Sequence, residues 1–399
     1  MSASVSTAER LTSHEHAVEV AGRLADEFAP GAARRDRDRV VPREELERIG
    51  QSGLLALTVP TELGGAGLGA ATVAEVTRLL AVADGSISQV LQNHYVFVRA
   101  FLMHGDASQR HRLAARVVDG ARLGNALSER GGPRTGVLTT RLAATDDPGR
   151  WRLSGRKYYA TGALTAQIVP VRARGLDGGD VFVYVDRDAP GVEVIDDWAS
   201  LGQRGTHSGT VVLTDVEVTP DDVIAPPAPV ERPTADGAFG QLIHVAIDVG
   251  LAEGALAAAV DIVRTSARVY ADSTAERASE DLHVLSEVGE LEILVRGALA
   301  LLGEAARRVD EAGEQPTSAQ AAEASVAVAA AKVAASRTAV RVANELFALG
   351  GTSSTDESLG LDRWWRDARV HTLHDPDRYK LHHIGNWVLN GVRPAGALL

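Results

Sequence analysis

The sequence predicts a mostly α-helical protein in which a small β domain lies between two helical domains. Apolar residues recur at the helical spacing of three and four in the first third of the chain, alternate with polar residues in the middle, and return to helical spacing in long segments thereafter. We expect an N-terminal helical domain over residues 1–121, a central antiparallel β domain over 122–226 and a C-terminal helical bundle over 227–399. With 399 residues and 45% hydrophobic content, the chain can bury a substantial core.

Composition excludes several classes of function. The formal net charge of -12 disfavours nonspecific attraction to nucleic acid or to an anionic membrane. There are no cysteines, which removes disulfides, thiol catalysis and thiolate metal sites. The N-terminus lacks the apolar core of a signal peptide, and no window approaches the roughly 18 consecutive apolar residues of a membrane span. We therefore expect a cytoplasmic protein.

Helices separated by short breaks account for most of the N-terminal domain. The expected helices are residues 15–28, 43–52, 70–83, 86–103 and 107–119. Glycines after three of them, at positions 53, 105 and 120, support these ends. Residues 59–69 are too rich in glycine for a helix interior. No strand clearly precedes this segment and it lacks the Walker lysine, so we expect a structural turn and not a phosphate-binding loop.

Short alternating segments predict the strands of the central domain. They are residues 137–143, 151–153, 157–161, 168–173, 181–185, 192–195 and 210–218. Turn signals such as Asp188-Ala-Pro-Gly191 separate them, which favours a compact antiparallel sheet, either a small barrel or a sandwich. The proline-rich residues 225–233 are expected to form a linker.

Three long amphipathic segments predict an antiparallel bundle. The expected helices cover residues 238–270, 281–312 and 317–349, and at least one more follows. Small residues lie on several faces of residues 321–342, so this helix is either sandwiched between neighbours or used at a subunit interface.

The run from Leu361 to Pro376 concentrates costly and reactive side chains. If the run is helical, His371 and His374 share one face, and Pro376 should end the helix near Asp375. A histidine beside a carboxylate can titrate near neutrality, as acid–base catalysis requires. On this run alone, the favoured interpretation is a capped, solvated helix end whose tryptophans pack into the core. Two histidines are also too few for a metal site, and no metal is expected.

Several short motifs follow one another along the chain: a Pro-x-x-x-Gly-Gly turn at 60–65, Leu127-Ser128-Glu129, residues 151–161, a Gly-x-Arg…Ser-Gly segment at 202–209, Gly350-Gly351 and Arg366-Asp-Ala-Arg369. Together with the order of domains, these motifs resemble the acyl-CoA dehydrogenase family over nearly the whole chain. Leu127-Ser128-Glu129 stands in place of the family's Val-Thr-Glu, and residues 151–161 stand in place of its strand ending in Trp-Ile-Thr.

One position separates two chemistries on this fold. Many dehydrogenases of the family carry their catalytic glutamate where this chain has Asp375, whose carboxylate stops about 1.5 Å short, and a misplacement of ~1 Å can cost about a hundredfold in rate. Some members place the glutamate on another helix. The segment His371-Thr-Leu-His374-Asp-Pro376 instead resembles the flavin-dependent monooxygenase branch, which includes the dibenzothiophene monooxygenases and the sulfur-acquisition oxidoreductases.

This resemblance implies a homotetrameric, FMNH2-dependent monooxygenase that uses a flavin C4a-hydroperoxide to oxygenate a small organosulfur substrate. Reduced FMN would come from a separate NAD(P)H:flavin reductase. The alternatives are an N-oxygenase of an amine or amino sugar, an FAD-dependent acyl-CoA dehydrogenase, and a scaffold that binds no flavin. Arg268-Val-Tyr-Ala271 keeps the arginine of the family's Arg-x-x-Phe segment but not its aromatic residue, which favours FMN although FAD stays possible.

The resemblance also implies roles for individual residues. His374 would donate to the flavin-bound oxygen with His94 nearby, and the Thr161 hydroxyl would lie near N5, where its methyl group would crowd the flavin slightly. His371 would be either a supporting residue or exposed. The expected cofactor-binding residues are Asn125, Leu127, Ser128, Tyr159, Ala160, Thr161, Trp198, Arg268, Gly350 and Gly351. Against these roles, Ser128 and Thr161 could merely close turns and Trp198 could be a core residue.

Overall fold

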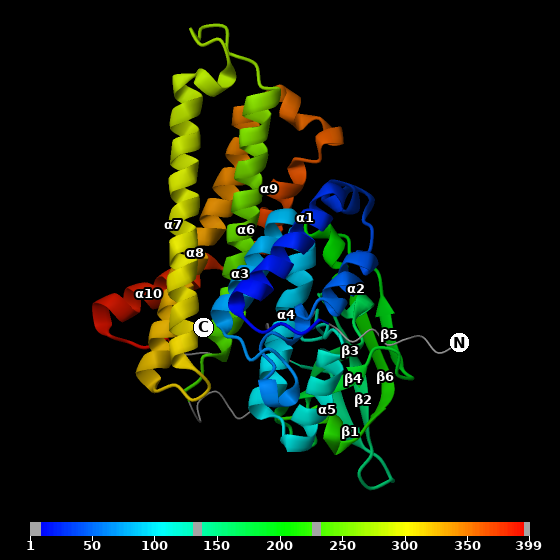
Figure 1. Cartoon of the computed structure of the whole chain (residues 1–399). Coiled ribbons are helices and arrows are strands. Elements are labelled where there is room, and N and C mark those ends of the chain that lie inside the picture. Colours follow the sequence, from blue (N-terminus) through cyan, green and yellow to red (C-terminus); the bar gives the residue numbers. More distant parts are fainter. Residues whose placement is uncertain (1–8, 131–137, 226–232, 395–399) are drawn as a thin grey trace.

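Helices, a β-sheet and a long helical bundle follow one another along the chain, as the sequence predicts. The computed structural model describes residues 9–130, 138–225 and 233–394. In Figure 1 the long helices of the bundle stand side by side, the N-terminal helices pack beside them, and the sheet lies at the lower right. The mostly helical fold with a small β domain is therefore confirmed, whereas the expected linker over 225–233 lies almost entirely outside the described residues.

The five expected N-terminal helices are all present. They are α1 (His14–Asp38), α2 (Arg43–Gln51), α3 (Ala70–Ala83), α4 (Gly85–His104) and α5 (Ala107–Val118). The prediction was wrong at the end of α1, which continues through Pro30 for ten residues beyond Phe28. The ring of Pro30 removes one helical hydrogen bond. The helix continues because Ala32 and Arg35 are buried, and the Arg35 guanidinium donates to the Phe28 carbonyl at 2.6 Å.

The sheet has seven strands among the described residues, in the order β5-β6-β2-β1-β3-β4-β7. They are β1 (Arg141–Ala144), β2 (Trp151–Lys157), β3 (Ile168–Arg174), β4 (Asp180–Asp186), β5 (Val192–Ile195), β6 (Thr210–Val218) and β7 (Val223–Ile224). Neighbouring strands are antiparallel except β1 and β3, which pair in parallel at Arg141 and Arg174.

Residues 157–161 were expected to form a strand of their own, and this prediction was wrong. β2 ends at Lys157, and Tyr159 has a left-handed backbone (φ 55°) that turns the chain away from the sheet. Few non-glycine residues adopt this conformation, and those that do often lie at functional sites. The two-residue strand β7 was not predicted, because two residues are too few to show a period of two.

The bundle consists of α6 (Asp236–Thr265), α7 (Leu282–Ala312), α8 (Ser318–Gly350), α9 (Asp362–His371) and α10 (Asp377–Asn390). α6 ends five residues before the predicted Tyr270, and both Arg268 and Tyr270 beyond its end are exposed. The alanine-rich α8 packs against α6 and α7. Its residues Ala331, Ala335 and Ala339 are completely buried, so the first of the two roles predicted for this helix, burial between neighbours, is present within one chain.

The described residues form two hydrophobic cores. The N-terminal helices and the bundle share one continuous core, and the sheet has a core of its own. α6 runs through the first core and is long and apolar enough to cross a membrane by length and composition alone. Because 78% of its most apolar window is buried by protein, the core accounts for this hydrophobicity.

Candidate active site

The hydroxyl groups of Thr161, Ser208 and Thr206 form a hydrogen-bonded chain close to the left-handed turn at Tyr159, which follows strand β2. The buried Thr161 hydroxyl is 2.7 Å from the Ser208 hydroxyl, which lies 2.7 Å from that of Thr206. Thr206 in turn donates to the Gln203 carbonyl at 2.8 Å. Thr161 therefore belongs to a polar network that connects two loops, and its role is not limited to closing one turn.

Two aromatic side chains border this hydroxyl chain. The Tyr159 side chain is 49% exposed, and its ring meets the Trp198 ring edge to face with 6.1 Å between centroids. The Trp198 indole donates to the Gln203 carbonyl at 2.9 Å, and the Asn125 amide donates to the Tyr159 carbonyl at 3.3 Å. Trp198 is only half-buried, so its side chain is not a core residue. An exposed aromatic surface beside small hydroxyls suits a flat heteroaromatic ring.

The segment 125–129 forms the other border. Leu127 is half-buried, and Ser128 is exposed and pairs with Tyr158 through a backbone bridge. Beside it, the Glu129 carboxylate accepts hydrogen bonds from Lys157 and from Thr140. Burial favours the neutral acid, but these hydrogen bonds outweigh it and hold the pKa of Glu129 well below its usual range. The Glu129–Lys157 pair, which the sequence did not single out, anchors this border to β2.

A second cluster surrounds His371, which is buried at the end of α9. Its Nδ1 is 2.5 Å from an Asp248 carboxylate oxygen, and its Nε2 is 3.1 Å from the Gln89 amide oxygen and 3.0 Å from Nδ1 of His244. These partners come from α6 and α4, so three helices converge here. His371 was predicted to be either a supporting residue or exposed, and the structure buries it.

His374 lies just beyond α9, at the open side of the same cluster. The helix ends at His371 and not near Asp375, so the two histidines do not share a helical face as predicted. The His374 ring packs on that of His244 with 4.2 Å between centroids. Surrounding protein, and then the charges of His371 and Lys332, lower the pKa of His374. The residue keeps an exposed surface, so solvent moderates this shift, whose direction leaves the imidazole neutral near pH 7.

Helix α4 contacts both the loop that carries Thr206 and Ser208 and the histidine cluster. Gly205, in the loop that carries Thr206 and Ser208, packs against Ser86, and Gln89, three residues further along α4, contacts His371. Residues three apart on a helix share a face and differ by about 4.5 Å along its axis. The loop that carries two of the hydroxyls and the histidine cluster therefore contact the same stretch of α4. Within the described ranges, no group of three or more His, Asp or Glu side chains is arranged to hold a metal ion.

The position of His94 does not fit the expected role as a second donor to oxygen. Its ring is completely buried, with Nε2 2.8 Å from the Leu55 carbonyl and Nδ1 accepting from the Leu123 amide at 3.1 Å. Burial lowers the pKa of His94 to about 4, so the ring is neutral and its two nitrogens are one donor and one acceptor. Both are used by the backbone, and His94 therefore joins two segments of the fold.

Three expected cofactor-binding residues lie elsewhere. Arg268 is exposed just beyond the end of α6, and Gly350, at the end of α8, packs close to Ile262 of α6. Gly351 follows with a positive φ of 63°. This end of the bundle is at the top of Figure 1, whereas the sheet is at the lower right. Within one chain, Arg268, Gly350 and Gly351 do not join the hydroxyl chain.

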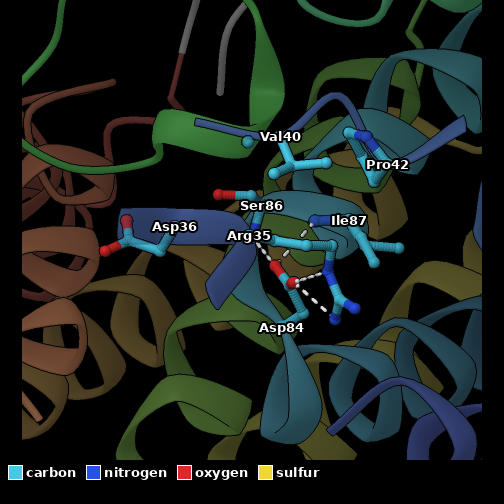
Figure 2. A pocket seen from close by; sticks show the side chains of 8 residues that line it. Arg35, Asp36, Val40, Pro42, Asp84, Ser86 and Ile87 are labelled. Carbon is cyan, nitrogen blue, oxygen red and sulfur yellow. Dashed lines mark hydrogen bonds and ion pairs between the residues drawn. The ribbon is translucent and has the colours of Figure 1, made fainter. Parts of the chain in front are cut away.

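Buried ion pairs hold the loop that carries Gln203 to Ser208. Arg366 of α9 pairs with Asp36 of α1 and donates to the Leu201 carbonyl at 3.2 Å. Figure 2 shows the neighbouring pair, in which the Arg35 guanidinium donates to the Asp84 carboxylate at 3.0 Å beside a small cavity. The cavity holds about 10 Å³, which is room for one water molecule and not for a substrate. We therefore assign a structural role to this junction of α1, α9 and the loop, which contains the Arg366–Asp36 and Arg35–Asp84 pairs.

Asp367 also joins α9 to the loop at Gln203, and its ionisation should change the free energy of unfolding with pH. Its carboxylate accepts from the Gln203 amide at 2.5 Å, and burial together with the charge of Asp36 raises the pKa of Asp367 to about 7. The folded protein then binds more protons than the unfolded chain between about pH 4 and pH 7, so this group lowers stability as pH rises through that window. Asp367→Asn keeps the hydrogen bond and removes the charge. We expect unfolding titrations to show a smaller loss of stability across this window in Asp367→Asn than in wild type.

The matched control is Asp362→Asn on the same helix. The pKa of Asp362 is lowered: burial opposes ionisation, but the Arg366 hydrogen bond outweighs it. The contribution of Asp362 to the pH dependence therefore lies below its ordinary pKa, and the slope between pH 4 and 7 should persist. An unchanged slope in Asp367→Asn would show that Asp367 is ionised throughout.

Comparison with known proteins agrees with this arrangement. The acyl-CoA dehydrogenase N-terminal, middle and C-terminal domain families match residues 12–121, 125–216 and 242–376. The chain therefore belongs to the acyl-CoA dehydrogenase family.

Relatives that are more than 30% identical over nearly the full length include monooxygenases. Dibenzothiophene monooxygenase of Mycolicibacterium goodii is 33% identical, with 96% of each chain covered. A probable FMNH2-dependent monooxygenase, SfnC, of Pseudomonas putida is 31% identical, with 95% of this chain and 96% of that protein covered. The solved structure of TdsC from Paenibacillus sp. A11-2 with FMN and indole has a TM-score of 0.91 at 31% identity, covering 97% and 100% of the two chains. Methanesulfinate monooxygenase MsuC from Pseudomonas fluorescens has a TM-score of 0.89 at 31% identity, covering 96% and 98%.

Proposed function

We propose that the protein is a two-component monooxygenase that uses FMNH2 from a separate NAD(P)H:flavin reductase to oxygenate a small organosulfur compound. The observation that carries the proposal is the position of His374, whose ring packs on that of His244 at the edge of a buried polar cluster, in a chain that also holds the linked hydroxyls of Thr161, Ser208 and Thr206. A neutral imidazole carries one N–H group and can donate a hydrogen bond to oxygen without being positively charged. The names of the full-length relatives support the sulfur substrate and the reduced FMN.

The side chains around Thr161 fit FMN. Tyr159, Trp198 and Leu127 offer the apolar surface that an isoalloxazine ring needs, and the hydroxyls of Ser128 and Thr161 suit its polar edge. Reduced FMN and O2 would supply one oxygen atom to the substrate sulfur, through the expected C4a-hydroperoxide, while the second oxygen leaves as water. The chain's part is to exclude water, to hold the ring against Tyr159 and to present the His374 N–H.

The environment of Asp375 disfavours a dehydrogenase. Its carboxylate is 2.7 Å from the buried Lys380 ammonium and is therefore engaged in an ion pair. A base that removes a carbon-bound proton must instead direct its carboxylate at the substrate. The ion pair adds to the shorter reach of aspartate.

The far end of the bundle supports a site shared between subunits. Arg268, Gly350 and Gly351 can serve the flavin of Thr161 only if another copy of the chain brings them there. Large apolar side chains are exposed on α7 and α10, among them Leu282, Ile293, Val388 and Leu389. Exposed patches of this kind mark interaction surfaces. We propose a cytoplasmic homotetramer in which these faces are covered.

Thr161 offers a test of the flavin position. Thr161→Val keeps the shape but removes the hydroxyl, and the loss of one hydrogen bond of about 0.5–1.5 kcal/mol should weaken FMN binding by roughly 2- to 10-fold. The measurement is a titration of FMN fluorescence. Thr161→Ser is the control and should bind FMN as wild type does. Equal affinity of wild type and Thr161→Val would remove the hydroxyl from the cofactor site.

The function itself is tested by mixing the enzyme anaerobically with FMNH2 and then admitting ¹⁸O2 with a probe substrate. We expect one labelled oxygen atom in the sulfur product of dibenzothiophene or methanesulfinate, measured by mass spectrometry. Labelled product from an amine or amino sugar alone would replace the sulfur proposal by N-oxygenation. Bleaching of bound FAD by an acyl-CoA without oxygen transfer would establish the dehydrogenase alternative.

A further inference from the structure

An ion pair is buried at the centre of the bundle, directly behind the histidine cluster. The Lys332 ammonium of α8 lies 2.6 Å from one carboxylate oxygen of Asp248 on α6, and both side chains are completely inaccessible to solvent. Replacing a buried ion pair by apolar side chains is often neutral or stabilising. Stability alone is therefore a weak reason for placing two charges here.

The other carboxylate oxygen of Asp248 determines where His371 carries its proton. An ionised carboxylate only accepts hydrogen bonds, so Nδ1 of His371, 2.5 Å away, must be the protonated nitrogen. Burial lowers the pKa of His371 despite the carboxylate, so the ring is neutral and its Nε2 is an acceptor. The tautomer of His371 thus follows from the charge of Asp248.

The accepting Nε2 of His371 also constrains where its neighbours carry their protons. Nδ1 of His244 is 3.0 Å from the accepting Nε2, so His244 must carry its proton on Nδ1 and leave its own Nε2 without one. Burial, followed by the repulsion that a protonated His374 or His371 would exert, lowers the pKa of His244 and keeps this ring neutral. The Gln89 amide oxygen is placed 3.1 Å from Nε2 of His371, so an accepting Nε2 requires this amide to be turned by 180°, and the N–H groups of His244 and Gln89 then share the single lone pair of Nε2.

His244 is the member of the cluster whose ring contacts His374 of the proposed site. Its ring lies 4.2 Å from that of His374, with 40° between the planes, whereas the rings of His371 and His374 are 6.5 Å apart. His374 lies beyond α9, so no helical backbone fixes its ring. On the other side, the Asp375–Lys380 ion pair is the nearest charged pair along the chain. The orientation of His374 therefore depends on that of His244.

We propose that Asp248, held ionised by Lys332, is a positioning residue for His374: it sets the tautomers of His371 and His244, and the His244 ring holds the His374 imidazole toward the site. This inference rests on the proposed function for its consequence in catalysis. The arrangement itself can be tested without flavin. Lys332 contributes by keeping the buried carboxylate charged, since an unpaired buried Asp would take up a proton.

The test compares a single variant with a charge-balanced double variant. Asp248→Asn strands the Lys332 ammonium and should destabilise the fold strongly. Asp248→Asn/Lys332→Met removes both charges and should recover most of that stability. If the pair were purely structural, the double variant would also recover every other property. The matched control is Arg78→Met/Glu253→Gln, which removes another ion pair of α6, distinct from the Asp248 pair.

The first measurement uses the flavin-free protein. Exchange of the ring C2–H of each histidine is followed by mass spectrometry against pH, which reports the pKa and accessibility of individual rings. We expect faster exchange at His371, His244 and His374 in the double variant, and no change in the control. Wild-type exchange at all three rings in the folded double variant would overturn the proposal, whatever the enzyme's substrate is.

The second measurement uses the enzyme loaded with FMNH2 in air. The double variant should release a larger fraction of the reducing equivalents as hydrogen peroxide, with a rate of product formation lower by on the order of tenfold. FMN affinity should stay within about twofold of wild type, because none of the proposed FMN-binding side chains is altered. Wild-type coupling in the double variant would also overturn the positioning role. Absence of oxygenated product in the wild type, together with altered histidine exchange in the variant, would reject the proposed function and leave the positioning intact.

Discussion

Replacing His374 with alanine is expected to lower the rate of oxygenated-product formation by about 10²- to 10⁴-fold, the usual contribution of a positioned proton donor. The variant should still bind FMN, because the surface formed by Tyr159, Trp198 and the Thr161 hydroxyl does not include His374. Oxygen should continue to be consumed and should end as hydrogen peroxide. Parallel measurement of oxygen uptake, peroxide and product resolves these quantities.

His383→Ala provides the matched control. His383 lies on α10, nine residues further along the chain, and it packs edge to face against His382. Its removal should leave product and peroxide at wild-type levels. Full coupling of oxygen use to product in His374→Ala would take His374 out of the mechanism.

Replacing Arg366 with alanine is expected to lower the free energy of unfolding by about 3–5 kcal/mol, the usual cost of breaking a buried ion pair. Arg366 is buried at the junction of three parts of the fold, where it pairs with Asp36 and Asp362 and donates to the Leu201 carbonyl. Without it, the buried Asp36 carboxylate keeps only a marginal contact with Arg204. Equilibrium unfolding in denaturant measures the difference.

Arg369→Ala is the control for this change, because Arg369 lies one turn away on the same helix and is exposed. Its removal should cost less than about 0.5 kcal/mol. Asp36→Asn combined with Arg366→Met should recover part of the lost stability, since no buried charge is left unpaired. Equal stability of Arg366→Ala and Arg369→Ala would show that the junction contributes little.

Much of the helical part of the fold could be predicted because its ends have local causes. Asp84 accepts from the first amides of α4, and Asp106 forms a capping box with Gln109 at the start of α5. Where tertiary contacts decide, local signals fail. Proline usually ends a helix, but α1 continues through Pro30. No residue type near Tyr159 indicates the left-handed backbone that Tyr159 adopts.

The candidate site shows the same division. Thr161 and His374 could be singled out because they lie in recognisable motifs, and His374 lies beside the cluster that supports the proposed chemistry. The motif containing His94 was equally visible, yet its ring nitrogens are used by the backbone. Asp248 and Lys332 lie 84 positions apart on two helices, and only packing brings them together. His244 and Asp248, four residues apart in an otherwise apolar stretch of α6, were the available signal.

The contacts of α9 also order events during synthesis of the chain. Arg366 reaches back 330 positions to Asp36, and His371 reaches 282 positions to Gln89. Until the ribosome has released residues near 371, the loop from Gln203 to Ser208 lacks its anchor and the histidine cluster lacks its central member. Contacts at such long separation form late, because the chain between them must be ordered first. The nascent protein therefore completes its proposed oxygen-handling site only after both hydrophobic cores have been largely synthesised.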